Sequence, residues 1–114
     1  MLKGLGGLGD MAKMMQAAKD MQSKMEALNA EMERITVEGE AGAGLVKARA
    51  TAKGELTGLD IDPAILVASE KEVVEDLILA AIKDAQARAQ ARYGQEVRKM
   101  AEAMGLPPDM KLPF

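Results

Sequence analysis

The chain has 114 residues, of which about half are apolar, and a net charge of −3, which suggests one small domain. It contains no cysteine and no histidine, so disulfide scaffolds, thiol or imidazole nucleophiles and the usual zinc ligands are excluded. The only aromatic residues are Tyr93 and Phe114, whereas alanine, aliphatic residues and ten methionines are plentiful, and this composition favours long helices.

The first predicted element is a long helix. From Met11 onward, apolar residues recur in alternating steps of three and four, which is a heptad seam that faces a partner element. We expect the helix to begin near Gly9 or Asp10, with Asp10 as its N-cap, and to end near Arg34, after a flexible N-terminus at residues 1–9. Such a seam usually covers a sheet or a sibling helix, and a methionine groove for other ligands is the alternative. The seam consists of Met11, Met14, Ala18, Met21, Met25, Leu28, Met32 and Ile35.

Three short strands follow, because residues 35–62 alternate with a period of two in "ITVEGE", "LVKARATAK" and "LTGLDID". Glycine-containing turns separate them, so an antiparallel meander is predicted. One face of the second strand is rich in alanine and suits the close approach of a helix. The opposite face carries Lys47, Arg49 and Lys53, which we interpret as solvated side chains, with a basic contact surface as the alternative.

The glycine-rich stretch "GEAGAG" at residues 39–44 invites comparison with a phosphate-binding loop. Gly39 and Gly44 have the right spacing, but Leu45 stands where that loop needs its lysine, and a strand follows instead of a helix. We therefore predict a turn in which glycine supplies a positive φ. Asp60 and Asp62 share one face of the third strand, but aspartates that end a strand before a proline are usually surface residues, so we expect no metal site. The sequence shows no catalytic constellation either, so we expect no cofactor and no catalytic residues.

A second long helix is predicted from Glu70 to about Ala103. The segment "SEKE" from Ser69 has the spacing of a capping box, and Gly94 is expected to loosen the helix. The longest uninterrupted apolar run of the chain, residues 77–82, is far too short to span a bilayer, so no membrane partner is expected. The chain closes with a predicted extended tail.

Several stretches combine into a specific pattern: "GLGGLG", "MAKMMQAAKDMQSKM", "GEAGAGLVK", the "IDP" after the third strand, and "MGLPPDMKLPF". With these motifs the chain resembles, nearly from end to end, the YbaB/EbfC family of bacterial nucleoid-associated DNA-binding proteins. Asp109 and Met110 stand where the family often has glycine and an aromatic residue, and this departure touches only the tail.

The resemblance implies an α+β fold: a single domain over residues 1–114 with a long N-terminal helix, a three-stranded antiparallel meander and a long C-terminal helix, followed by an extended tail at 105–114. It implies a tweezer-like homodimer, joined through the sheet, whose helical arms grip double-stranded DNA. It also implies a cytoplasmic, nucleoid-associated location and a role in nucleoid organisation and gene regulation. Independently, a chain this short offers little cover for its seam and its alanine face, which favours a homodimer.

Five basic residues on the arms are the candidate DNA contacts. Lys13 and Lys24 are eleven residues apart and lie nearly in line on the first helix, whereas Arg88, Arg92 and Lys99 share one face of the last helix. Contacts of this kind go to phosphates and give affinity without sequence information, so low sequence specificity is expected. The alternative function is a dimeric helical adaptor or scaffold that binds a protein through the methionine seam or the tail.

Overall fold

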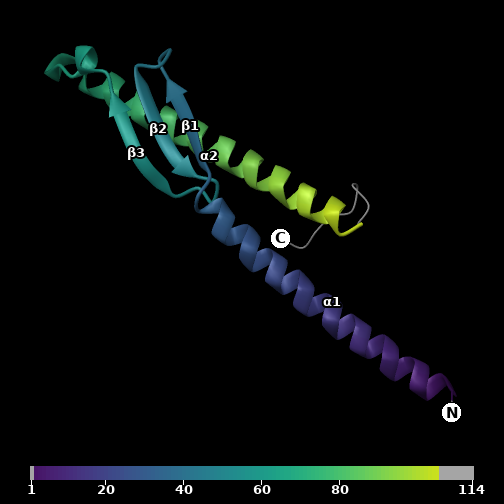
Figure 1. Ribbon diagram of the computed structural model, residues 1–114. Helices are drawn as coiled ribbons and strands as arrows, with labels where there is room; N and C mark the ends of the chain where they lie inside the picture. Colours follow the sequence, from purple (N-terminus) through teal and green to yellow (C-terminus); the bar gives the residue numbers. More distant parts are fainter. Residues whose placement is uncertain (1, 106–114) are drawn as a thin grey trace.

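The computed structural model describes the backbone of residues 2–105 and the side chains of residues 9–105. Two long helices flank a three-stranded sheet, and two short 3-10 turns connect the sheet to the second helix (Figure 1). This order confirms the predicted α+β fold. The elements are α1 (Leu2–Met32), β1 (Thr36–Ala41), β2 (Val46–Thr51), β3 (Leu56–Ile61), the 3-10 turns η1 (Pro63–Ile65) and η2 (Ala68–Glu70), and α2 (Lys71–Ala103).

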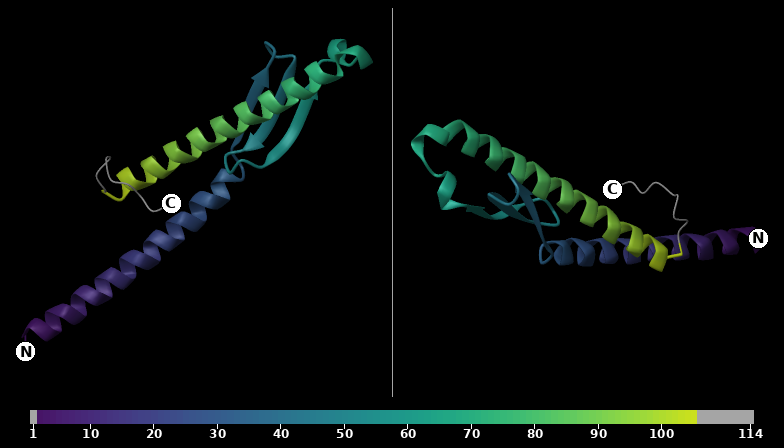
Figure 2. Two further views of the ribbon diagram at one scale, coloured as in Figure 1. Left: turned by 180° about the vertical axis from the view of Figure 1, so that it is seen from behind. Right: turned by 90° about the horizontal axis from the view of Figure 1, so that it is seen from above.

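The molecule is elongated because α1 leaves the sheet as an arm. Its extents are 82 × 24 × 19 Å and its radius of gyration is 21.7 Å, whereas a compact domain of 100 residues has a radius of about 13 Å. Helix α2 crosses one face of the sheet and then runs antiparallel beside the C-terminal half of α1 (Figure 2). The opposite face of the sheet and the N-terminal half of α1 are not covered by any described helix.

The sheet has the order β1-β2-β3 with both pairs antiparallel, which confirms the predicted meander. Its register sets Gly39 and Leu59 on either side of Ala48, so these three residues share the face toward α2. A Cβ at Gly39 would collide with the backbone of Ala85, so glycine is needed for α2 to approach β1 this closely. Small side chains therefore bring the helix down onto the sheet. The buried core here consists of Val46, Ala48, Ala50, Ala81 and Ala85.

A second buried cluster anchors the arm. Leu28 and Met32 of α1 pack with Ala52, which follows β2, and with Val97 of α2. The C-terminal half of the predicted seam is thus covered, as a sibling helix would cover it. The N-terminal half is not, since Met11 and other seam residues before Met21 are exposed.

The glycine-rich stretch forms the β1–β2 turn, as predicted. Gly42, Ala43 and Gly44 have φ angles of 63°, 55° and 88°, the left-handed region that glycine adopts at little cost. The Leu45 N–H donates to the Gly42 carbonyl at 3.2 Å, and β2 follows directly. No helix N-terminus follows the turn, so it lacks the amides that a phosphate loop requires.

Three details of the predicted helices are wrong. Helix α1 begins at Leu2, so Asp10 lies inside it instead of at its N-cap; extending an existing helix costs less than nucleating one, which lets the glycine-rich start join. Ser69 lies in η2, and α2 has no side-chain cap, because the backbone N–H of Lys71 already donates to the Ala68 carbonyl. The helix also continues through Gly94 without a break.

The expected flexibility of residues 1–9 stays a prediction. The predicted tail lies outside the described residues beyond Gly105.

Candidate nucleic-acid interface

The flank of α2 beside β1 carries the first predicted pair, Arg88 and Arg92. The Arg88 Nε donates to Asp84 Oδ2 at 3.1 Å, and the same carboxylate oxygen accepts the backbone N–H of Glu40 in β1 at 2.9 Å. The Glu40 N–H, and after it Arg88, lowers the pKa of Asp84 below its ordinary value. Asp84 therefore links α2 to the edge strand β1 and also binds the guanidinium of Arg88.

Further along the same flank, Arg92 and Lys99 share one acid. Their nitrogens lie 3.2 Å and 3.3 Å from Glu96 Oε1. The Glu96 side chain is only 13% exposed, whereas Arg92 and Lys99 are 43% and 69% exposed. All three predicted contacts on α2 thus face solvent on one flank, yet each has an acidic partner. These acidic partners neutralise part of the positive charge on this flank.

The two predicted lysines on α1 have a different environment. Both are exposed, and within residues 9–105 no carboxylate forms an ion pair with either. Lys24 and Lys99 line one groove between α1 and α2. Lys13 lies about 16 Å further along α1, past the end of α2. The structure therefore brings Lys24 to Lys99 but leaves Lys13 alone on the arm.

Two further cations on α2 were missing from the predicted set. Lys83 and Arg98 are exposed, and in the described part of the chain neither forms an ion pair. The available signal was their place in the net basic segment 83–99. Their freedom from acids makes them candidate phosphate contacts equal to those on α1.

The outer face of the sheet is charge-matched. Its register sets Lys47 between Glu40 and Asp60, and pairs Arg49 with Glu38. Arg49 Nη1 lies 2.6 Å from Asp60 Oδ2, and this hydrogen bond raises the pKa of the Arg49 guanidinium. The guanidinium lies over Gly58, where any side chain would collide with it. The interpretation of this face as solvated is thus favoured over a basic contact surface.

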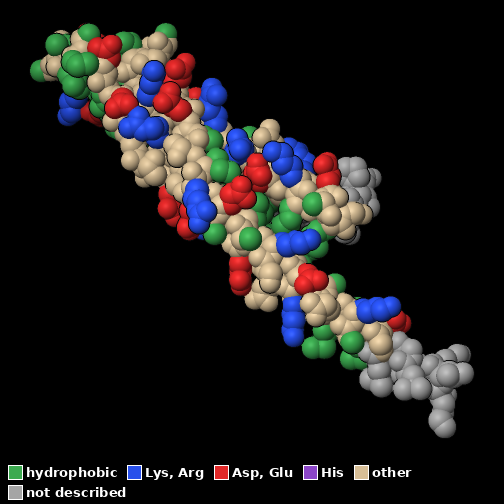
Figure 3. Space-filling view, in the orientation of Figure 1, with side chains coloured by type: hydrophobic (Ala, Val, Ile, Leu, Met, Phe, Trp, Pro, Cys, Tyr) green, Lys and Arg blue, Asp and Glu red, His purple; other side chains and the backbone are tan. Residues whose placement is uncertain are grey.

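Figure 3 shows the same mixing over a wider area, because blue and red side chains alternate across the sheet and α2. The described residues contain no group of three or more His, Cys, Asp or Glu side chains that could hold a metal ion. Asp60 binds Arg49, and Asp62 Oδ1 accepts the Ala64 N–H at 2.9 Å as the cap of η1. No helix within residues 2–105 is long and apolar enough to cross a membrane.

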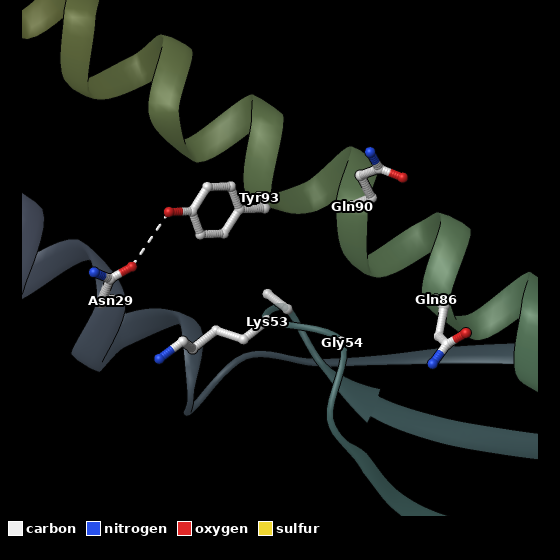
Figure 4. A pocket seen from close by; sticks show the side chains of 7 residues that line it. Asn29, Lys53, Gly54, Gln86, Gln90 and Tyr93 are labelled. Carbon is white, nitrogen blue, oxygen red and sulfur yellow. Dashed lines mark hydrogen bonds between the residues drawn. The ribbon is translucent and has the colours of Figure 1, made fainter. Parts of the chain in front are cut away.

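A pocket of about 410 Å³ lies between α2 and the β2–β3 turn (Figure 4). Gln86, Gln90 and Tyr93 come from α2, and the Tyr93 hydroxyl donates to Asn29 Oδ1 of α1 at 3.3 Å. The lining holds amides, one phenol and Lys53 but no carboxylate. Through this hydrogen bond, Tyr93 links α2 to α1.

Comparisons with known proteins agree with the element order. A nucleoid-associated protein of Rhodopseudomonas palustris (strain HaA2) is 45% identical over 105 residues, covering 92% of this chain and 99% of that protein. A nucleoid-associated protein of Agrobacterium fabrum is 44% identical, covering 92% and 98%. The crystal structure of an uncharacterized protein from Helicobacter pylori shares the fold, with a TM-score of 0.66 at 20% identity, covering 75% of this chain and 89% of that one. The sequence pattern of the YbaB/EbfC DNA-binding family matches residues 7–104, and the chain belongs to this family.

Proposed function

We propose that this protein is a nucleoid-associated homodimer that grips double-stranded DNA with its helical arms, in the cytoplasm, and that it organises the nucleoid and influences gene expression. One observation carries the proposal: in a member of a DNA-binding family, all but one of the exposed cations that form no ion pair within the described residues lie on the two long helices, the exception being Arg34 just after α1. On the sheet, in contrast, Arg49 forms an ion pair with Asp60, and the register places Lys47 between Glu40 and Asp60.

The chemistry of these side chains favours phosphate contacts. Lys13 and Lys24 are point charges on a single exposed helix, and a lysine ammonium carries little directional information. Arg88 and Arg92 could in principle fork onto a base edge, but their acidic neighbours already orient them. We therefore expect binding to the DNA backbone with low sequence specificity.

Uncovered apolar side chains support the homodimer. Helix α2 packs on β1 and β2 and leaves most of β3 open, although Leu56 and Leu59 point to the same side of the sheet. These two leucines are 47% and 42% exposed, and Leu79 of α2 is 57% exposed. A second copy placed against β3 would cover them and would also protect its free strand edge.

A second exposed apolar surface also supports the homodimer. Leu66 and Val67, between the 3-10 turns, are 57% and 49% exposed, and Figure 3 shows apolar side chains gathered at this end of the molecule.

A gel-shift titration with random and genomic duplexes at several salt concentrations tests DNA binding. If four to eight phosphates are neutralised per dimer, the slope of log affinity against log salt is roughly −4 to −7. A slope near zero, or one duplex bound orders of magnitude more tightly than all others, would contradict the proposed mechanism.

Sedimentation at micromolar protein tests the dimer separately. The expected mass is twice the 12.1 kDa of the chain. Leu59→Glu should shift the protein toward a monomer, because it buries a charge in the proposed interface. The matched control Lys47→Glu lies on the outer face of the sheet and should remain dimeric. A folded wild-type monomer at this concentration refutes the dimer and leaves DNA binding to be judged by the salt titration.

A further inference from the structure

The N-terminal half of the α1 seam is an apolar stripe that the described fold leaves uncovered. Met11, Met14 and Met15 are 60%, 71% and 61% exposed. The same seam is buried further on, where Leu28 and Met32 pack under α2. An apolar stripe that is covered along one half and bare along the other indicates that a further segment packs there.

Helix α2 ends beside the point where the cover stops. The two helices run antiparallel: Tyr93 bonds to Asn29, and the later residues Lys99 and Met100 line a groove with Lys24. The last turn of α2 therefore lies near Met21.

A left-handed residue then ends the helix. Gly105 has a φ of 77°, and its N–H donates to the Glu102 carbonyl at 3.0 Å. This geometry closes the helix and turns the chain off its axis.

Nine residues follow, "LPPDMKLPF" at 106–114, outside the described part of the chain. Extended, they reach about 30 Å, whereas the distance from Met21 to Met11 along α1 is about 15 Å. In an extended segment Met110, Leu112 and Phe114 share one side, so the tail carries an apolar edge of its own. Its three prolines also reduce the conformational entropy that ordering it would cost.

We propose that the tail, residues 106–114, packs in an extended form along the uncovered α1 seam of its own chain. Its apolar edge lies against Met11, Met14 and Met21, where the Phe114 ring meets the polarizable methionine sulfurs. The tail of the same chain is favoured over a second copy because its attachment beside the seam gives an effective concentration of about millimolar.

The docked tail leaves the DNA-binding side of the arm free. Lys13 and Lys24 lie roughly 100° around α1 from the seam. The tail contact is therefore independent of DNA binding, and its test does not use DNA.

Disulfide trapping in the full chain tests the contact, because the protein has no native cysteine. Met14→Cys with Leu112→Cys should form an intrachain disulfide on oxidation, seen as a faster-migrating single chain on a non-reducing gel. The bond requires Cα atoms within about 7 Å of each other. The matched control, Lys47→Cys with Leu112→Cys, should stay reduced. An interchain disulfide would show that the tail of a second copy lies on the seam, and a failure to cross-link would show that no tail does; either result overturns the proposal.

Fluorescence provides a second measurement, since the chain has no tryptophan. The emission of Phe114→Trp should lie at a shorter wavelength than in the unfolded protein. Adding Met11→Ser and Met14→Ser should return it to the solvent value with unchanged helical circular dichroism. Leu66→Ser, at the far end of the molecule, should leave the emission unshifted. Solvent-like emission in the parent variant, or emission unaffected by the seam changes, refutes the docked tail.

Discussion

The outer face of the sheet and the helical arms both carry lysine and arginine, but the two regions differ in how many acidic residues surround these side chains. On the sheet, the register sets Lys47 between two acids, and Arg49 is tied to Asp60 at 2.6 Å. On α1, Lys13 and Lys24 have no acidic partner within the described residues. From this difference we expect a basic residue to attract DNA more strongly where its neighbours leave its charge unmatched than where acids surround it.

Helix α2 is intermediate between these two regions. Two of its arginines, Arg88 and Arg92, pair with acids one turn away on the same helix, at Asp84 and Glu96. Both arginines are exposed to solvent. Ion pairs near the surface contribute little to stability and are screened by salt, so a phosphate can replace the carboxylate as the partner of the arginine. The α2 flank is thus available to DNA, but binding requires each arginine to exchange its carboxylate partner for a phosphate.

The largest expected effect comes from reversing the α2 flank. Arg88→Glu with Arg92→Glu replaces attraction by repulsion at four places in the proposed dimer. DNA affinity should fall by more than about tenfold, and the salt slope should become shallower. Exposed substitutions of this kind usually change the free energy of unfolding by only about 0.5 kcal/mol each. Circular dichroism and sedimentation should therefore match the parent. Undiminished DNA affinity would remove α2 from the interface.

A smaller and opposite effect is expected from Asp84→Asn. This variant frees Arg88 and removes one negative charge per chain, while the amide oxygen can still accept the Glu40 N–H. DNA affinity, measured by titration of a labelled duplex, should rise by roughly a few-fold. Unchanged or weaker binding would show that Arg88 does not meet phosphate.

The same variant has a second readout in acid. Because the folded-state pKa of Asp84 is lowered, its stabilising contribution is complete above the ordinary aspartate pKa of about 3.9. That contribution is lost as the pH falls through the lower folded-state value. Acid unfolding of Asp84→Asn should lack this component, so the stabilities of the two proteins should converge at the acid end.

The smallest effect is expected on the sheet. Lys47→Glu changes the charge as much as either arginine substitution, but the residue sits among acids and away from the arms. Screening over about 8 Å at physiological salt confines its influence, so DNA affinity should change by less than about twofold. A loss as large as that of the α2 variant would move the contact surface to the sheet.

Local patterns predicted much of this fold. The heptad spacing around Met25 and the alternation around Ala48 indicated a helix and strands that the structure confirms, because both patterns report which face is buried. The capping box at Ser69 failed because the backbone of η2 satisfies the first amides of α2. That outcome depends on how the chain leaves β3, which no local pattern records.

The candidate site was predicted less completely. The basic residues and their helical faces follow from the sequence spacing. The same spacing places Asp84 one helical turn from Arg88, and Glu96 one turn from Arg92. The hydrogen bond from Glu40 to Asp84 spans 44 positions in the sequence, so it depends on tertiary packing. The position along α1 at which α2 ends also depends on packing. That position determines whether Lys13 has residues of α2 beside it.

Lysine footprinting of the unmodified protein tests most directly whether the arms grip DNA. Amine acetylation with and without a saturating random duplex, followed by mass spectrometry, measures the protection of each lysine in one experiment. If the arms grip DNA, Lys13, Lys24 and Lys99 are protected in the complex, whereas Lys47 and Lys53 react equally in both samples. Protection of Lys47 and Lys53 with unchanged reactivity on the arms would contradict it.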